Sequence, residues 1–275
     1  MPEEPPLVKH FNIPYAKIEG VDPNLLSLNL YAPAGAQDAP VMVYVHGGGW
    51  SMGDKSAVGK KAEFFTGAGW ILASVNYRLL PSGRHPRNVE DIAAAVAWVH
   101  DNIAEHGGDP ESIFLMGHSA GCHLVSLVAT DGSHLEKAGK SLDVIKGVVA
   151  LDTQAYDVEK LLDRPLGSAT YRSVFGEEQE AVRNAAPIRH VARDKGIPPF
   201  LVCYSRGLGR RASPQRAAQA RAFAAALREA GVGAEIVDAS DRSHGEINQW
   251  FGDPEDEKVT GRAKAFLEAL RKQRP

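Results

Sequence analysis

The chain has 275 residues, a net charge of −3 and 44% hydrophobic residues. These values are ordinary for a globular protein that can bury a large core. The near-neutral charge argues against a dedicated nucleic-acid surface, and no apolar run approaches the roughly 20 residues of a membrane span. We therefore expect neither nucleic acid nor a membrane among its partners.

Predicted strands and helices alternate along the chain. In order, they are a strand at Leu26–Tyr31, a strand at Val41–Val45, a helix over Ser56–Gly67, a strand at Trp70–Asn76, a helix over Asn88–Glu105, a strand at Ile113–Gly117, a helix from Ser119, a strand at Val144–Leu151, a strand at Phe200–Tyr204, a helix over Pro214–Ala230, a strand at Ala234–Ala239 and a helix over Glu255–Lys272. Residues 153–197 are less regular and contain short helical patches. The alternation predicts an α/β protein with a mostly parallel central sheet and helices on both faces.

The N-terminal stretch Met1–Pro6 and the two cysteines bear on location. The stretch is acidic and proline-rich and carries no signal-peptide pattern. Cys122 and Cys203 each fall in a predicted core element, so we expect buried free thiols rather than a disulfide. We therefore expect a cytoplasmic protein. The length is compatible with a single domain over residues 1–275.

Several polar segments follow the carboxyl ends of predicted strands. They are His46–Trp50, Ser119, Asp152, the loop from Ser205, and His244. Ligands of open α/β sheets bind at this edge. We therefore expect these segments to converge on one rim.

Two glycine-containing strings point to a chemistry. Gly117-His118-Ser119-Ala120-Gly121 joins a predicted strand to a predicted helix, as a nucleophile elbow does. His46-Gly47-Gly48-Gly49-Trp50 follows the strand Val41–Val45 and can turn backbone N–H groups toward a developing oxyanion. Neither string has the spaced glycines and lysine of a phosphate-binding loop. Together they indicate a serine hydrolase.

Two further strings, Asn76-Tyr77-Arg78-Leu79 and Gly107-Gly108-Asp109-Pro110, accompany the elbow and the glycine loop. With them the chain resembles the α/β-hydrolase fold. It is similar to the hormone-sensitive-lipase-like esterases and to the neighbouring branch that includes kynurenine formamidase. The resemblance implies an oxyanion hole formed by Gly48, Gly49 and Ala120. Those esterases have a long N-terminal cap segment. Because the first predicted strand here begins at Leu26, we expect only a small cap-like insertion within residues 153–197.

A serine hydroxyl needs a base to become a good nucleophile. We expect His244 to be that base because it follows the last predicted strand. His46 is expected to brace the glycine loop, His118 to point away from the Ser119 hydroxyl, and His123 to pack on the elbow helix.

A serine–histidine pair is completed by an acid that bonds the histidine, and together they form a catalytic triad. No acid occurs where the resemblance places it. The loop Ser205–Pro214 contains no acidic residue, and the formamidase branch would have its aspartate at Ala212. We prefer Asp152, which ends the strand beside the elbow strand. Alternatives are Asp241, Glu246, Asp238 or a Ser–His pair without an acid. The carboxylate matters because it fixes the imidazole tautomer and stabilises the imidazolium.

These observations predict a carboxylic-ester hydrolase that acts on small or short-acyl esters through an acyl-enzyme on Ser119. The expected partner is a small-molecule ester, and no metal or organic cofactor is required. The sequence is also compatible with a homo-oligomer. One alternative is an arylformamidase-type amidase, which Trp50 and Ser213-Pro214 favour. Another is a non-catalytic ligand-binding module, which the missing acid favours. A cluster of arginines, Arg206, Arg210 and Arg211, is either a solvated loop or a positive rim for an acidic substrate.

Overall fold

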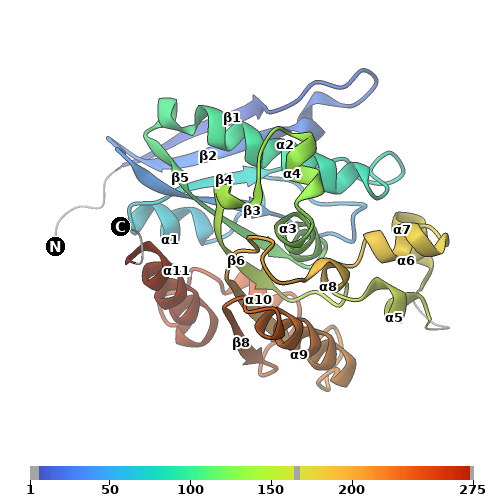
Figure 1. Cartoon of the computed structure of the whole chain (residues 1–275). Coiled ribbons are helices and arrows are strands. Elements are labelled where there is room, and N and C mark those ends of the chain that lie inside the picture. Colours follow the sequence, from blue (N-terminus) through green and yellow to red (C-terminus); the bar gives the residue numbers. More distant parts are fainter. Residues whose placement is uncertain (1–5, 164–167, 273–275) are drawn as a thin grey trace.

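The computed structural model describes residues 6–163 and 168–272. Residues 1–5, within the stretch on which the predicted location rests, and 164–167, within the predicted insertion, lie outside the described residues. At the centre of the described chain is an eight-stranded sheet with the strand order β1-β2-β4-β3-β5-β6-β7-β8. Figure 1 shows this sheet running through the molecule with helices on either side.

The sheet is antiparallel at one edge and parallel elsewhere. β1 pairs with β2, and β2 with β4, in antiparallel fashion, whereas β4, β3, β5, β6, β7 and β8 are parallel. The strands are β1 (Leu7–Pro14), β2 (Ser27–Pro33), β3 (Ala39–Val45), β4 (Ile71–Val75), β5 (Gly108–His118), β6 (Ile145–Leu151), β7 (Phe200–Ser205) and β8 (Ala234–Ala239). The predicted α/β-hydrolase fold with a mostly parallel sheet is confirmed.

Two hydrophobic cores fill the space between the sheet and its helices. On one face, α2 (Arg87–Asn102), α3 (Ala120–Thr130) and α9 (Pro214–Glu229) bury their apolar sides. On the other face lie α1 (Lys61–Gly67) and α11 (Arg262–Lys272), which are neighbours in Figure 1. Each face of the sheet is therefore covered, as a parallel sheet requires.

Shorter elements connect these layers. They are α4 (Ser133–Lys137), α5 (Val158–Leu162), α6 (Ser168–Phe175), α7 (Gln179–Asn184), α8 (Pro187–His190), α10 (Glu246–Gln249), the 3₁₀ turns Pro23–Leu26, Ile103–His106 and Leu142–Val144, and a π-helical turn at Glu257–Gly261. The helices α5 to α8 fall within residues 153–197, and Figure 1 shows α6 and α7 together at one end of the molecule. Both cysteines are buried and free, as expected.

Several element predictions need correction. The strand predicted at Ile113–Gly117 begins at Gly108, and the helix predicted over Asn88–Glu105 is α-helical only to Asn102 and ends in a 3₁₀ turn. The first strand, β1, was not predicted, because its side chains are mostly exposed and a register shift between His10 and Ile13 breaks any alternation. The helix predicted from Ser56 begins at Lys61, because the Asp54 side chain binds the Ser56 N–H and holds a turn there. The closing helix predicted from Glu255 begins as a π-helical turn and becomes α-helical at Arg262.

All parallel strands end on the same edge of the sheet. β3, β5, β6 and β7 end at Val45, His118, Leu151 and Ser205. The segments singled out in the sequence follow these ends and therefore share one rim. In the described part of the chain, no helix combines the length and the hydropathy needed to cross a membrane.

Candidate active site

Ser119 occupies a strained turn between β5 and α3. Its φ of 56° and ψ of −115° are rarely adopted outside glycine, at a cost of about 1–3 kcal/mol. The surrounding structure enforces this conformation: the Ser119 N–H donates to the Leu151 carbonyl at 3.0 Å. The flanking glycines are needed for close packing. A Cβ at Gly117 would lie 2.3 Å from the Gly121 oxygen, and one at Gly121 would lie 2.1 Å from the Val45 oxygen.

Three side chains from distant parts of the chain form a hydrogen-bonded series. The Ser119 Oγ lies 2.8 Å from His244 Nε2, and His244 Nδ1 lies 2.7 Å from Asp152 Oδ2. Because a carboxylate only accepts, Nδ1 carries the ring proton and Nε2 is free to accept the hydroxyl proton of Ser119. The structure thus brings together the serine, the histidine and the first-choice acid predicted from the sequence.

Asp152 is fully buried at the end of β6 and is held by several donors. The Ser205 N–H donates to Oδ1 at 3.0 Å, and the Ser205 hydroxyl donates to Oδ2. Arg216 Nη1 lies 2.9 Å from Oδ1. Burial raises the pKa of Asp152, but the His244 hydrogen bond and the Arg216 charge outweigh it and lower the pKa to about 2. The carboxyl is therefore ionised at neutral pH.

The other candidate acids are bound elsewhere. Asp241 contacts Lys258 and Arg242, and Asp238 accepts from the Tyr204 hydroxyl. Glu246 accepts from the Ser243 N–H at 2.6 Å and from Arg206 at 3.2 Å. Of the four carboxylates weighed from the sequence, Asp152 is the one that bonds His244 in the described structure.

Ser205 and Arg216 are the site residues that the sequence reasoning missed. Ser205 had a usable signal, because it ends β7 and opens the loop in which the acid was expected. Arg216 lies in the first turn of α9. It gave no usable signal in the sequence, because a long arginine side chain can reach many places. It is 4% exposed and lines the cavity beside Ser119.

The remaining histidines behave largely as expected. His118 turns away from the Ser119 hydroxyl and bonds the His244 carbonyl through Nε2 at 2.8 Å. Burial and the nearby His244 lower the pKa of His118 to about 3, so it is neutral. His46 bonds the Gly47 carbonyl through Nδ1 at 2.7 Å and stacks on Tyr77, which braces the glycine loop. His123 is buried on α3 and bonds the Ala185 carbonyl.

The glycine loop faces the elbow across a small cavity of about 220 Å³. Gly49 and Ala120 line it with Ser119, whereas Gly48 is not among the described residues of its lining. Gly48 has a φ of 122°, and a Cβ there would lie 2.0 Å from the Met52 carbonyl oxygen. In the described part of the chain the N–H groups of Gly48 and Gly49 donate to no protein acceptor. The arrangement can therefore offer backbone donors to an anionic oxygen formed beside Ser119.

Tyr171 from α6 and Leu208 from the loop after β7 form part of the cavity wall. Of the arginines considered as a positive rim, Arg206 bonds Glu246, and Arg210 and Arg211 are exposed. Those three arginines are not among the described residues that line the cavity. The cation at the site is Arg216.

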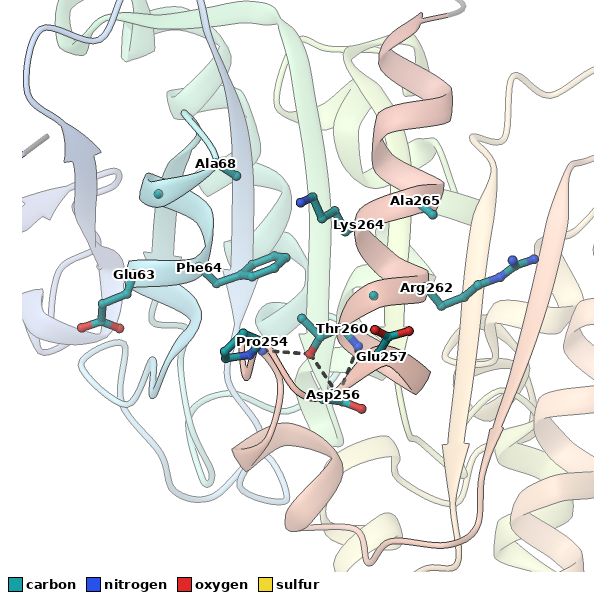
Figure 2. A pocket seen from close by; sticks show the side chains of 13 residues that line it. Glu63, Phe64, Ala68, Pro254, Asp256, Glu257, Thr260, Arg262, Lys264 and Ala265 are labelled. Carbon is teal, nitrogen blue, oxygen red and sulfur yellow. Dashed lines mark hydrogen bonds between the residues drawn. The ribbon is translucent and has the colours of Figure 1, made fainter. Parts of the chain in front are cut away.

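A larger cavity of about 790 Å³ lies between α1 and α11. Figure 2 shows that its polar groups include Thr260, which is hydrogen-bonded to Asp256, and the outward-turned Glu63 and Arg262. Its described lining contains no histidine and no cysteine. It therefore lacks a hydroxyl–imidazole pair such as Ser119 and His244 form, and the smaller cavity is the candidate active site. No group of side chains suited to a metal ion occurs among residues 6–163 and 168–272.

The sheet order, the strained serine between β5 and α3, and the hydrogen-bonded series define an α/β-hydrolase. The chain belongs to the BD-FAE family, whose profile matches residues 28–207. The resemblance to the esterase branch of the fold, inferred from the motifs, is confirmed.

The chain is similar to several curated esterases. It is 34% identical over 203 residues to Esterase LipQ of Mycobacterium tuberculosis, which corresponds to 70% of this chain and 47% of LipQ. It is 30% identical over 235 residues to Isoprenylcysteine alpha-carbonyl methylesterase ICME of Arabidopsis thaliana, which corresponds to 80% of this chain and 54% of the relative. The chain thus spans about half the length of the curated relatives it matches.

Solved structures share the fold. Esterase B from Lactobacillus rhamnosis superposes with a TM-score of 0.79 at 23% identity, over 99% of this chain and 88% of that chain. Esterase 2 of Thermogutta terrifontis, solved after phosphoramylation by tabun, superposes with a TM-score of 0.73 at 24% identity, over 98% of this chain and 96% of that chain.

Proposed function

We propose that this protein is a carboxylic-ester hydrolase that works through an acyl-enzyme on Ser119. The observation that carries the proposal is the unbroken hydrogen-bond series from Asp152 through His244 to the Ser119 hydroxyl. The names of the curated relatives, among them Esterase LipQ, agree with it. A non-catalytic module would have no need for this series or for the strained serine.

In the first half-reaction, His244 Nε2 takes the Ser119 proton as Oγ attacks the acyl carbon of the ester. The N–H groups of Gly48, Gly49 and Ala120 hold the resulting oxyanion. Asp152 stabilises the imidazolium through Nδ1. The intermediate collapses, His244 returns the proton to the leaving alcohol, and the acyl group stays on Oγ.

In the second half-reaction, His244 removes a proton from water, which attacks the acyl carbon. The second tetrahedral intermediate expels Oγ, which regains its proton from His244, and the carboxylic acid leaves. Every proton thus passes through one imidazole nitrogen. None of these steps uses a metal or an organic cofactor.

The size of the cavity supports a small or short acyl group. Its volume of about 220 Å³ is below the roughly 300–1,000 Å³ typical of pockets for drug-sized ligands. Helix α6 contributes Tyr171 to the wall, so residues 153–197 act in part as a small cap in this proposal. We further propose a single domain over residues 1–275 and, from the two buried free thiols, a cytoplasmic location.

A fluorophosphonate probe and a p-nitrophenyl ester series test the proposal together. We expect covalent labelling at Ser119, turnover of acetate and butyrate esters, and loss of both in S119A. S133A removes an exposed serine hydroxyl from α4 and serves as the matched control. Absence of labelling at a dose that labels ordinary esterases would instead support a binding module. Faster turnover of N-formylkynurenine than of any ester would support an arylformamidase-type amidase.

A further inference from the structure

Arg216 lies four residues after Ala212, the position at which the resemblance would place the acid. The loop after β7 carries no carboxylate, and it leads directly into α9 (Pro214–Glu229), whose first turn contains Arg216. The side chain extends to Asp152, where Nη1 lies 2.9 Å from Oδ1 and 3.2 Å from the carbonyl oxygen of that residue. A cation from this segment therefore meets an acid that comes from the neighbouring strand.

The two oxygens of Asp152 are divided between different partners. Oδ2 accepts from His244 Nδ1 and from the Ser205 hydroxyl, whereas Oδ1 accepts from the Ser205 N–H and from Arg216. The side chains of Arg216 and Asp152 are 5% and 0% exposed. A buried carboxylate without a counter-charge tends to take up a proton. Arg216 supplies the counter-charge for the buried carboxylate of Asp152.

The same guanidinium also lies beside the base. Nη1 is 3.3 Å from His244 Nδ1. Because Nδ1 carries the proton that is donated to Asp152, this is an approach of two donors and not a hydrogen bond. The guanidinium therefore lies against both the Asp152 carboxylate and the His244 ring.

Other groups that face the pair do not change charge near neutral pH. Burial lowers the pKa of His118 and raises those of the nearby thiols and phenol. The groups that remain neutral are His118, Cys122, Cys203 and Tyr156. Outside the described lining of the cavity, Arg206 and Glu246 form an ion pair at 3.2 Å. The charges that act directly on His244 are therefore Asp152 and Arg216.

We propose that Arg216 is a positioning residue for ester hydrolysis, which provides the counter-charge of the Asp152 carboxylate and holds it in hydrogen-bonding position for His244 Nδ1. The inference rests on the proposed function above. It assigns a task to a cavity-lining residue that takes part in no bond-making or proton-transfer step of the reaction sequence above. We expect its effect on turnover to pass through Asp152, the carboxylate with which it pairs.

A double-mutant cycle between Arg216 and Asp152 tests this dependence. We expect R216M to lower kcat by about 10–100-fold with KM changed by less than about threefold, because the base is displaced and substrate contacts stay. In a D152N background, R216M should change kcat by less than about threefold. R216K, which keeps the cation, should recover most of the loss. R221M, on the same helix and 3.7 Å from Asp238, is the matched control.

The dependence on Asp152 is a readout that a purely structural ion pair would not give. Equal losses in both backgrounds would overturn the proposal. If R216M does not fold, two other variants supply the test. R216K keeps a cation at this position. The double variant R216M/D152N removes both buried charges, so that neither is left unpaired.

A proton spectrum separates this inference from the proposed function because it needs no substrate. The His244 Nδ1–H bonded to Asp152 should give a far-downfield resonance in the unsubstituted protein and in R221M, and it should shift or vanish in R216M. An unchanged resonance in R216M refutes the positioning role whether or not the protein is active. Missing turnover and missing fluorophosphonate labelling of the unsubstituted protein would refute the esterase proposal instead.

Discussion

At the residue scale, the acid is the decisive position. Asp152 is buried, its pKa is lowered to about 2, and it reaches the ring nitrogen opposite the one that faces Ser119. We expect D152N to lower kcat by about 10³–10⁴-fold, because an amide neither fixes the tautomer nor stabilises the imidazolium, as seen when a serine protease loses this charge. Steady-state turnover of p-nitrophenyl acetate measures the loss.

D241N is the matched control for this substitution. Asp241 lies closer to His244 in sequence, yet its side chain is 47% exposed and bound to Lys258. Its removal should change kcat by less than about twofold, as for other exposed ion pairs. A large loss in D241N together with a small one in D152N would move the acid to Asp241.

The residues of the site differ in how far the sequence could reveal them. Ser119 and His244 have motif and positional signals, and Asp152 has a positional one, because a strand end fixes where a short side chain can reach. Arg216 has neither, since its distance from the site depends on how α9 packs against β7. The acid could thus be proposed from the sequence, whereas its counter-charge required coordinates.

At the element scale, boundaries were predicted unevenly for both helices and strands. The buried strand β3 (Ala39–Val45) was predicted to within two residues because a continuous apolar run has few alternatives. Helix α1 begins later than predicted because Asp54 caps a turn, a tertiary detail that also involves Asn76. The edge strand β1 escaped prediction because half-exposed side chains around a bulge resemble a loop.

Helix α1 also carries an unusual buried cation. Lys61 is 1% exposed, and its Nζ donates to the Asn248 carbonyl at 2.8 Å. Burial lowers the pKa of Lys61 from 10.5 to about 7. Between these two values the unfolded chain holds a proton that the folded protein lacks, so stability rises with pH across this window.

We expect K61M to be more stable than the unsubstituted protein by about 1–3 kcal/mol below pH 7, because the cost of burying an ammonium is removed. The difference should shrink as the pH rises from about 7 toward 10. Urea unfolding at several pH values measures it. K60M, which removes the neighbouring lysine with a 57% exposed side chain, should show no such trend. A difference that grows with pH would contradict the assignment.

At the scale of the whole molecule, the site depends on how separate regions meet at one edge of the sheet. Ser119 and Asp152 lie within residues 28–207, which match the family profile, whereas Arg216 and His244 lie beyond them. The α/β alternation in the sequence predicts this convergence, because parallel strands place their carboxyl ends together. The placement of residues 153–197 was not predictable in the same way, because short helices have weak periodicity.

The acyl-chain preference proposed above depends on this assembly. Tyr171 reaches the cavity from α6, and its ring lies 6.0 Å from that of Trp50, measured between centroids. We expect Y171A to raise kcat/KM for octanoate esters relative to acetate esters by about tenfold, because a wall of the acyl cavity is removed and each methylene buried there contributes to discrimination. F11A truncates a 55% exposed ring on β1 and should leave the ratio unchanged. An unchanged ratio in Y171A would place the acyl chain against Leu208 instead, on the loop after β7.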